Sequence, residues 1–175
     1  MMDSDWITAA LAEYEQPLIR YAAHILGRAG DVERAREVVQ DVFLKLCRQD
    51  RAELSDHLAQ WLYSVCRNRA LDVLRKERRM TGLGEAQLNM PDRNGSEIMS
   101  ALEREERYSG VLGILQTLPH NQQEVIRLKF SGDLSYQEIS AITKLSVSNV
   151  GFLIHTGLKT IREKSQKREA QRRTK

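Results

Sequence analysis

The chain has 175 residues, of which 41 % are hydrophobic and 29 % are charged, so it can bury one medium core or two small ones. It lacks the roughly 20-residue apolar run of a membrane span and the features of a signal peptide, which favours a cytoplasmic protein without membrane insertion. The two cysteines and four histidines show no ligand spacing, and no catalytic constellation stands out. We therefore expect no metal, no cofactor and no enzyme activity.

Charge is unevenly distributed along the chain. Residues 1–79 hold 13 basic and 13 acidic side chains, residues 80–110 hold 3 and 6, and residues 111–175 hold 11 and 5. The balances of 0, −3 and +6 add up to the net charge of +3. The C-terminal third is therefore a candidate binder of polyanions, although a basic tail that only aids solubility would have the same charge.

Apolar residues recur with helical spacing from end to end, which predicts an all-α fold of two small helical domains joined by a flexible linker. The expected boundaries are 1–79 for the first domain, 80–108 for the linker and 109–175 for the second domain. The first helix runs out near Gly27, and Asp31 is a suitable N-cap for the second helix. The buried face expected for that second helix comprises Ala35, Val38, Val39, Val42, Phe43 and Leu46.

A third helix is predicted after Ser55 and Asp56, and it is amphipathic in an unusual way. Its apolar side carries Leu62, Val65, Cys66, Ala70 and Val73, and its opposite side carries Asn68, Asp72, Arg75 and Arg79. A solvated helix end would also favour cations. Trp61 falls on the cationic side, and an aromatic ring beside arginines is how single-stranded nucleic acid is bound. A core position is an equal interpretation of Trp61.

The predicted linker collects Gly82, Gly84 and Pro91, and Ser96 could begin a further helix that Leu118-Pro119 ends. The next helix ends at Gly132. A capping box at Ser135 and Glu138, a turn at 143–145 and a cap at Ser146 then indicate a helix-turn-helix. The spacing of Ile139, Leu145, Val150 and Leu153 fits that motif, with a plain helical hairpin as the alternative.

Three segments in sequence closely resemble bacterial sigma factors. They are residues 35–46, the run from Trp61 through Asn68, Asp72 and Arg75 to Arg79, and the stretch from Leu118-Pro119 through residues 134–140 to residues 146–150. With only two lobes, the chain looks like the extracytoplasmic-function (ECF) group, which keeps the second and fourth sigma domains. The resemblance implies a subunit that binds core RNA polymerase, recognises promoter DNA and aids its melting.

The resemblance also implies roles for residues of the first domain. Glu37, Gln40 and Asp41 would bind the polymerase, although an ordinary solvated helix face is the alternative. The minus-ten promoter element would meet Trp61, Asn68, Arg75, Arg78 and Arg79, with Asp72 orienting its neighbours. The loop of residues 49–57 would capture a flipped base, for which Ser55, Asp56 and His57 are the candidates. Ser55 and Asp56 are equally explained as helix caps.

In the second domain the sequence departs from the sigma pattern, because residues 151–157 carry little positive charge. Reading of the minus-thirty-five element would fall to Ser148, Asn149, Phe152, His155 and Thr156, and phosphate contacts to Lys159, Arg162 and Lys164. Gly151 would mark a close approach of the backbone to DNA or to a partner. Lys144 stands where such turns usually place a left-handed glycine, and Ser140 and Thr143 replace the usual alanine and leucine.

The expected partners are core RNA polymerase, promoter DNA and an anti-sigma factor. One alternative is a sigma mimic that sequesters an anti-sigma factor. The low positive charge of residues 151–157, in the helix expected to read DNA, favours this alternative slightly. The cationic third helix and the basic tail argue against such a decoy. A free-standing helix-turn-helix repressor would leave residues 40–43 without a role.

Overall fold

The computed structural model describes residues 3–27, 32–80 and 110–173, and every regular element within them is a helix. This confirms the all-α prediction. The helices are α1 (Asp3–Leu26), α2 (Val32–Leu46), α3 (Arg51–Leu54), α4 (Leu58–Met80), α6 (Gly110–Leu115), α7 (His120–Ser131), α8 (Tyr136–Thr143) and α9 (Val147–Arg173). None of these helices has the length and apolarity needed to cross a bilayer. The expected cap Asp31, the helix start at Ser96 and residues 81–108 of the predicted linker lie outside the described residues, and Met80 ends α4.

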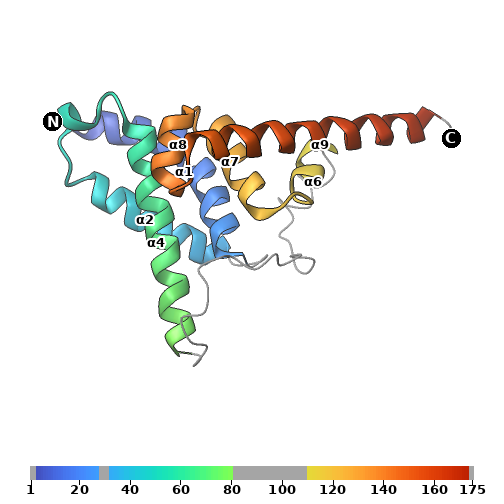
Figure 1. The fold of residues 1–175 in the computed structure, drawn as a ribbon. Coiled ribbons are helices and arrows are strands. Elements are labelled where there is room, and N and C mark those ends of the chain that lie inside the picture. The colour runs from blue at the N-terminus through green and yellow to red at the C-terminus, as the bar shows by residue number, and fades with distance from the viewer. Residues whose placement is uncertain (1–2, 28–31, 81–109, 174–175) are drawn as a thin grey trace.

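The first lobe is formed by α1 to α4, with α1, α2 and α4 packing on one another (Figure 1). Every residue of the predicted apolar face of α2 is buried, from Ala35 to Leu46. On α4, Leu62, Cys66 and Ala70 are fully buried. Full burial of an aliphatic side chain such as Leu62 contributes about 2–3 kcal/mol, so this packing fixes which side of α4 faces outward.

The short helix α3 was not expected from the sequence. It starts because the Asp50 side chain accepts a hydrogen bond from the Ala52 N–H at 2.8 Å, which is an N-cap. Ser55 is the C-cap of this helix, and its hydroxyl donates to the Ala52 carbonyl at 3.4 Å. The interpretation of Ser55 as a helix cap is therefore confirmed, and the helix that it caps is α3, at its C-terminal end.

The second lobe is formed by α6 to α9, with α7, α8 and α6 all packing against α9. Gly157 allows α9 to approach α7 closely, since a Cβ atom there would lie 2.6 Å from the Ile126 Cδ1 atom. Beyond this crossing α9 continues to Arg173 as a long arm (Figure 1). Along the arm, Lys164 donates to the Thr117 hydroxyl at 2.7 Å and Arg168 to the Gly110 carbonyl at 3.2 Å.

The helix-turn-helix has the caps that the sequence predicts. The Ser135 N–H donates to the Glu138 carboxylate at 2.7 Å, and the Glu138 N–H donates to the Ser135 hydroxyl at 3.2 Å, which completes the capping box. Ser146 accepts from the Asn149 N–H at the start of α9. Ile139 and Val150 are fully buried, and Leu145 and Leu153 pack against them at the edge of the core.

The turn between α8 and α9 explains the two unusual polar residues near it. Lys144 is left-handed, with φ of 64°, as its position suggested. The Thr143 hydroxyl donates to the Ile139 carbonyl at 2.8 Å, and the Ser140 hydroxyl donates to the Leu145 carbonyl at 2.6 Å. These side-chain bonds hold the backbone on both sides of Lys144, so Ser140 and Thr143 stabilise a turn that lacks glycine.

The two lobes are in contact with each other. Helix α7 lies on α1, and α8 lies on α4, so that apolar side chains of both lobes form one continuous core. Gly132 sits against the Tyr63 ring, where a Cβ atom would come within 2.8 Å of the ring and 2.9 Å of the Leu128 carbonyl oxygen. A side chain at position 132 would therefore force the lobes apart.

The two cysteines are expected to differ sharply in reactivity. Burial raises the pKa of the Cys66 thiol to about 12, whereas Cys47 is exposed. At pH 8 the folded chain should react with Ellman's reagent at one thiol within minutes and at the second only after denaturation. A Cys47→Ser variant is the control and should show no rapid reaction. Equal rates at both thiols would contradict the burial of α4.

Replacement of Lys144 by glycine should stabilise the second lobe. Glycine adopts the left-handed conformation without the steric cost of about 1 kcal/mol that a side chain carries. We expect Lys144→Gly to raise the free energy of unfolding in urea by about 1 kcal/mol. The matched variant Lys144→Ala removes the same charge but keeps the Cβ atom, so it should stay within about 0.5 kcal/mol of the natural chain. A gain of the same size in Lys144→Ala would refute the backbone explanation.

Candidate nucleic-acid interface

The cationic side of α4 faces outward over the second half of the helix. Asn68, Arg75 and Arg79 are exposed and Arg78 is half-buried, on the side opposite the buried Leu62, Cys66 and Ala70. This half of α4 extends away from the second lobe (Figure 1). The predicted minus-ten residues from Asn68 to Arg79 therefore share one open surface, which we call the α4 cationic face.

Neighbouring acidic residues hold α4 and its arginines in place. Arg75 donates to the Asp72 carboxylate at 2.9 Å, the i,i+3 contact expected for an orienting Asp72. Both side chains are about half exposed, so the pair contributes little stability and mainly restricts the Arg75 rotamer. Glu77 forms an ion pair with Arg34 of α2, which anchors the end of α4 to the first lobe.

Trp61 lies at the edge of the α4 cationic face but is partly buried, and its side chain packs against the core of the first lobe. The core interpretation of this residue therefore has structural support. A ring held by packing on one side can still offer its remaining edge to a base.

The loop candidates Ser55, Asp56 and His57 are exposed and line a groove of about 450 Å³ between the lobes. Asp133 and Glu138 of the second lobe and Glu13 of α1 also line this groove. Its carboxylates would repel a phosphate backbone, so in this arrangement the loop faces an acidic surface. The sequence could not indicate this groove, since its walls are far apart in the chain.

The candidate polymerase-binding residues lie on one face of α2. Glu37 and Gln40 are exposed, and Asp41 is half-buried. The Asp41 carboxylate accepts a hydrogen bond from the Arg69 guanidinium of α4 at 2.6 Å. Asp41 is therefore tied to α4, a role that no local pattern in the sequence indicated.

The candidate recognition residues form a continuous strip on α9. Ser148, Asn149, Phe152, His155, Lys159 and Arg162 are exposed, and Thr156 is half-buried, while Val150 and Ile154 point into the core. Phe152 is 65 % exposed, which is unusual for an aromatic ring. Gly151 lies beside the Tyr136 ring of the chain itself. A Cβ atom at position 151 would lie 3.4 Å from the Tyr136 Cε2 atom. That is an ordinary van der Waals contact, so the chain itself leaves room for a Cβ atom, and the close approach expected at Gly151 stays a prediction.

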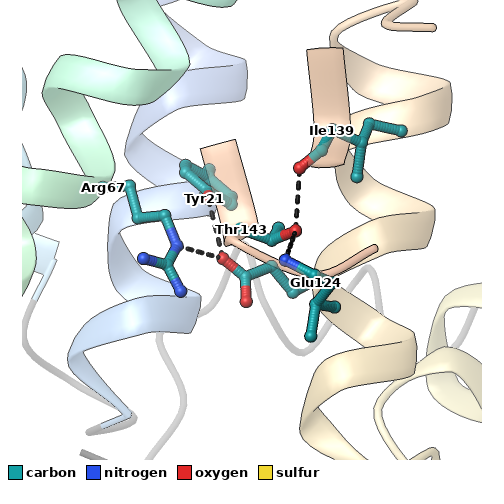
Figure 2. A network of polar contacts seen from close by, with 6 residues as sticks. Tyr21, Arg67, Glu124, Ile139 and Thr143 are labelled. Atoms are coloured by element: carbon teal, nitrogen blue, oxygen red, sulfur yellow. Dashed lines mark hydrogen bonds and ion pairs between the residues drawn. The ribbon is translucent and has the colours of Figure 1, made fainter. Parts of the chain in front are cut away.

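A buried polar contact joins the lobes, and the sequence analysis missed it. The Glu124 carboxylate of α7 accepts hydrogen bonds from the Tyr21 hydroxyl of α1 and from the Arg67 guanidinium of α4, both at 2.9 Å. Figure 2 shows both side chains reaching from the first lobe toward this carboxylate. Glu124 is 4 % exposed and Tyr21 is 2 % exposed. Burial, and then the Glu124 charge, raise the pKa of Tyr21 well above its ordinary value, so its hydroxyl remains a donor.

A second interlobe contact lies one helical turn away. The rings of His24 on α1 and His120 on α7 stack in parallel, with centroids 4.0 Å apart and an interplanar angle of 7°. Burial, and then the neighbouring His120 and Arg127, hold the pKa of His24 well below its usual value. The stack therefore favours a neutral His24 imidazole.

Two protein-family models match this chain. Residues 11–80 match the family model of Sigma-70 region 2, and residues 110–161 match the family model of Sigma-70, region 4.

Individual relatives are distant but extend over most of the chain. The ECF RNA polymerase sigma factor RpoE of Cereibacter sphaeroides is 28 % identical over 160 residues, covering 89 % of this chain and 86 % of the relative. The ECF RNA polymerase sigma factor SigM of Bacillus subtilis is 23 % identical over 125 residues, covering 71 % and 76 %.

Among solved structures, the sigma factor RpoE in complex with the anti-sigma factor NepR, from Bartonella quintana, has a similar fold. The TM-score is 0.57 at 18 % identity, and the match covers 91 % of this chain and 96 % of that chain. Since the two region models together span most of the sequence in the expected order, the chain belongs to the sigma-70 family and is an RNA polymerase sigma factor of the extracytoplasmic-function group.

Proposed function

We propose that the two lobes divide the work of promoter recognition. The first lobe (1–79) binds core RNA polymerase through the exposed face of α2 and the minus-ten element through the α4 cationic face. The second lobe (109–175) binds the minus-thirty-five element through α9, and residues 80–108 link the two. The observation that carries this proposal is the two-sided α4, which buries Leu62, Cys66 and Ala70 and leaves its arginines open.

The α4 cationic face suits a single strand better than a duplex. Arg75 and Arg79 are one helical turn apart on an exposed surface, and Asp72 restrains the first of them. Guanidinium groups bind phosphate in a fixed fork and stack on bases, so a row of them can follow an unpaired strand. Ser55, Asp56 and His57 are the candidates for receiving a base flipped from that strand.

The strip on α9 offers two kinds of contact to a major groove. Asn149 can bind adenine through two hydrogen bonds, and the exposed Phe152 can contact a thymine methyl. Ser148, His155 and Thr156 supply further polar contacts to bases. Lys159 and Arg162 follow on the same exposed side and would bind phosphates.

The second candidate function is a sigma mimic that sequesters an anti-sigma factor. The low charge of residues 151–157 favours it, and the solved relative was crystallised with an anti-sigma factor, so we expect such a partner here. The open α4 cationic face favours the initiation factor, because a decoy has no use for it. A protein that works with RNA polymerase acts in the cytoplasm and contributes no catalytic group of its own.

The first prediction from this proposal separates DNA opening from polymerase binding. Arg75→Ala with Arg79→Ala should reduce open-complex formation, detected by permanganate footprinting, at least tenfold while leaving co-purification with core polymerase unchanged. Gln40→Ala with Asp41→Ala should reduce co-purification, and open-complex formation should fall with it because only polymerase-bound chains can open a promoter. Each double variant is therefore the control for the other.

Two outcomes would contradict the assignment. Normal open-complex formation by the arginine double variant would exclude the α4 cationic face as the minus-ten site. Absence of transcription by the natural chain with purified core polymerase, on promoters selected from a random library, would favour the mimic.

The second prediction separates phosphate contacts from base contacts on α9. Each lost phosphate contact reduces the slope of log K against log salt by about 1, so Lys159→Ala with Arg162→Ala should reduce it by about 2 for every sequence. Asn149→Ala should leave the slope unchanged and lose discrimination of about 1–3 kcal/mol at one base pair. Both are measured by titration of minus-thirty-five duplexes. An unchanged slope in the double variant would remove these residues from the interface.

A further inference from the structure

The contact between the lobes is built like a specific interface. The Glu124 carboxylate is buried, and both of its donors, Tyr21 and Arg67, come from the opposite lobe. A buried charge without partners is strongly unfavourable, so separating the lobes must rehydrate Glu124. Tyr63 closes the contact on one side, packed edge-to-face on Tyr21 at 5.2 Å and directly against Gly132.

This contact is incompatible with promoter recognition as proposed above, on which the present inference rests. The minus-ten and minus-thirty-five elements are about 25 base pairs apart, or about 85 Å along a duplex. A compact chain of this size has a radius of gyration of about 16 Å. The candidate recognition residues at the start of α9 follow directly on α8, and α8 packs on α4. The two DNA-binding surfaces are therefore too close together to reach both elements.

The covalent connection does not prevent the lobes from separating. Residues 81–109 connect α4 to α6, and a segment of that length reaches about 100 Å when fully extended. What opposes separation is thus the noncovalent contact, and its strength sets the fraction of chains able to bind a promoter.

The stacked imidazoles make this contact sensitive to protons. His24 of α1 faces His120 and Arg127 of α7, and the Tyr21, Arg67 and Glu124 cluster lies beside it. Glu124 already accepts from Tyr21 and Arg67. A proton on His24 would place a charge 4.0 Å from a second imidazole and near a guanidinium, in a buried site.

We propose that the interlobe contact is an autoinhibitory lock of the free sigma factor, and that mild acid releases it through His24 and His120. The lock needs no inhibitor protein. It keeps the chain closed near neutral pH and gives promoter-competent chains when the pH falls.

The direction of the pH effect follows from the lowered pKa of His24 in the closed state. When the lobes separate, His24 returns toward its ordinary pKa of about 6.5, so the open state takes up a proton that the closed state cannot. Above pH 7.5 neither state is protonated and the lock is intact. Between pH 7.5 and pH 5.5 the ratio of open to closed chains should rise, by up to about tenfold from His24 alone.

The distance between lobes can be measured on the full chain without a partner. Fluorescent labels at Cys47, which is exposed, and at a Lys167→Cys site on the α9 arm report it by energy transfer, while Cys66 stays unlabelled because it is buried. We expect high transfer at pH 7.5 and an open population that is larger at pH 5.5, by up to about tenfold, with unchanged helical circular dichroism.

Substitutions distinguish the contribution of the His24–His120 stack from that of the buried Glu124 contact. The pair His24→Phe with His120→Phe keeps the stacked rings but cannot be protonated, so it should stay closed at both pH values. His155→Phe, on the exposed strip of α9, is the matched loss of a histidine and should keep the full pH response. Glu124→Gln removes the buried charge and should open the chain at pH 7.5.

Transcription with core polymerase then tests the inhibitory role. Glu124→Gln should reach half-maximal transcription at about one tenth of the concentration that the natural chain needs at pH 7.5. A transfer efficiency independent of pH, or a full response in the double phenylalanine variant, would overturn the histidine mechanism. An open Glu124→Gln variant with an unchanged concentration dependence would overturn autoinhibition. Failure of the natural chain to transcribe at all would count against the proposed function instead.

Discussion

The packing of α4 against α1 and α2 is the constraint on which the rest of the structure depends. Burial of Leu62, Cys66 and Ala70 fixes the rotation of a 23-residue helix, and this rotation decides what its other sides face. Its second half presents arginines to solvent, while its first half presents Tyr63 and Arg67 to the second lobe. One helix thus carries the core, the proposed DNA surface and the interlobe contact at different positions along its length.

In this arrangement the α4 cationic face is accessible, whereas the distance between the two lobes is restricted. The α4 cationic face is open even in the closed chain, so closure does not hide it. What closure restricts is the distance between the two proposed DNA-binding surfaces, since the contacts of α8 with α4 and of α7 with α1 hold the lobes together. The carboxylates of Glu13, Asp133 and Glu138 around residues 55–57 add an acidic wall beside the candidate base-capture loop. Closed and open chains therefore differ in reach and in the electrostatic surroundings of that loop.

Sequence reasoning succeeded wherever the determining contacts are local. The apolar face of α2, the capping box at Ser135 and the cap at Ser146 all depend on residues three or four positions apart, and all are confirmed. Contacts between distant residues had no such signal. The Tyr21–Glu124 bond joins residues 103 positions apart, and Asp41 meets Arg69 across 28 positions.

The central claim is that α2 and α4 of one small lobe face different partners, with polymerase on one side and the melted strand on the other. Site-specific photocrosslinking in the complete polymerase–promoter complex tests it most directly, with a crosslinking amino acid placed at Glu37 in one variant and at Arg79 in another. The account predicts that the probe at position 79 labels the non-template strand of the minus-ten element and the probe at position 37 labels a polymerase subunit. Labelling of polymerase alone from position 79, or of DNA from position 37, would contradict it.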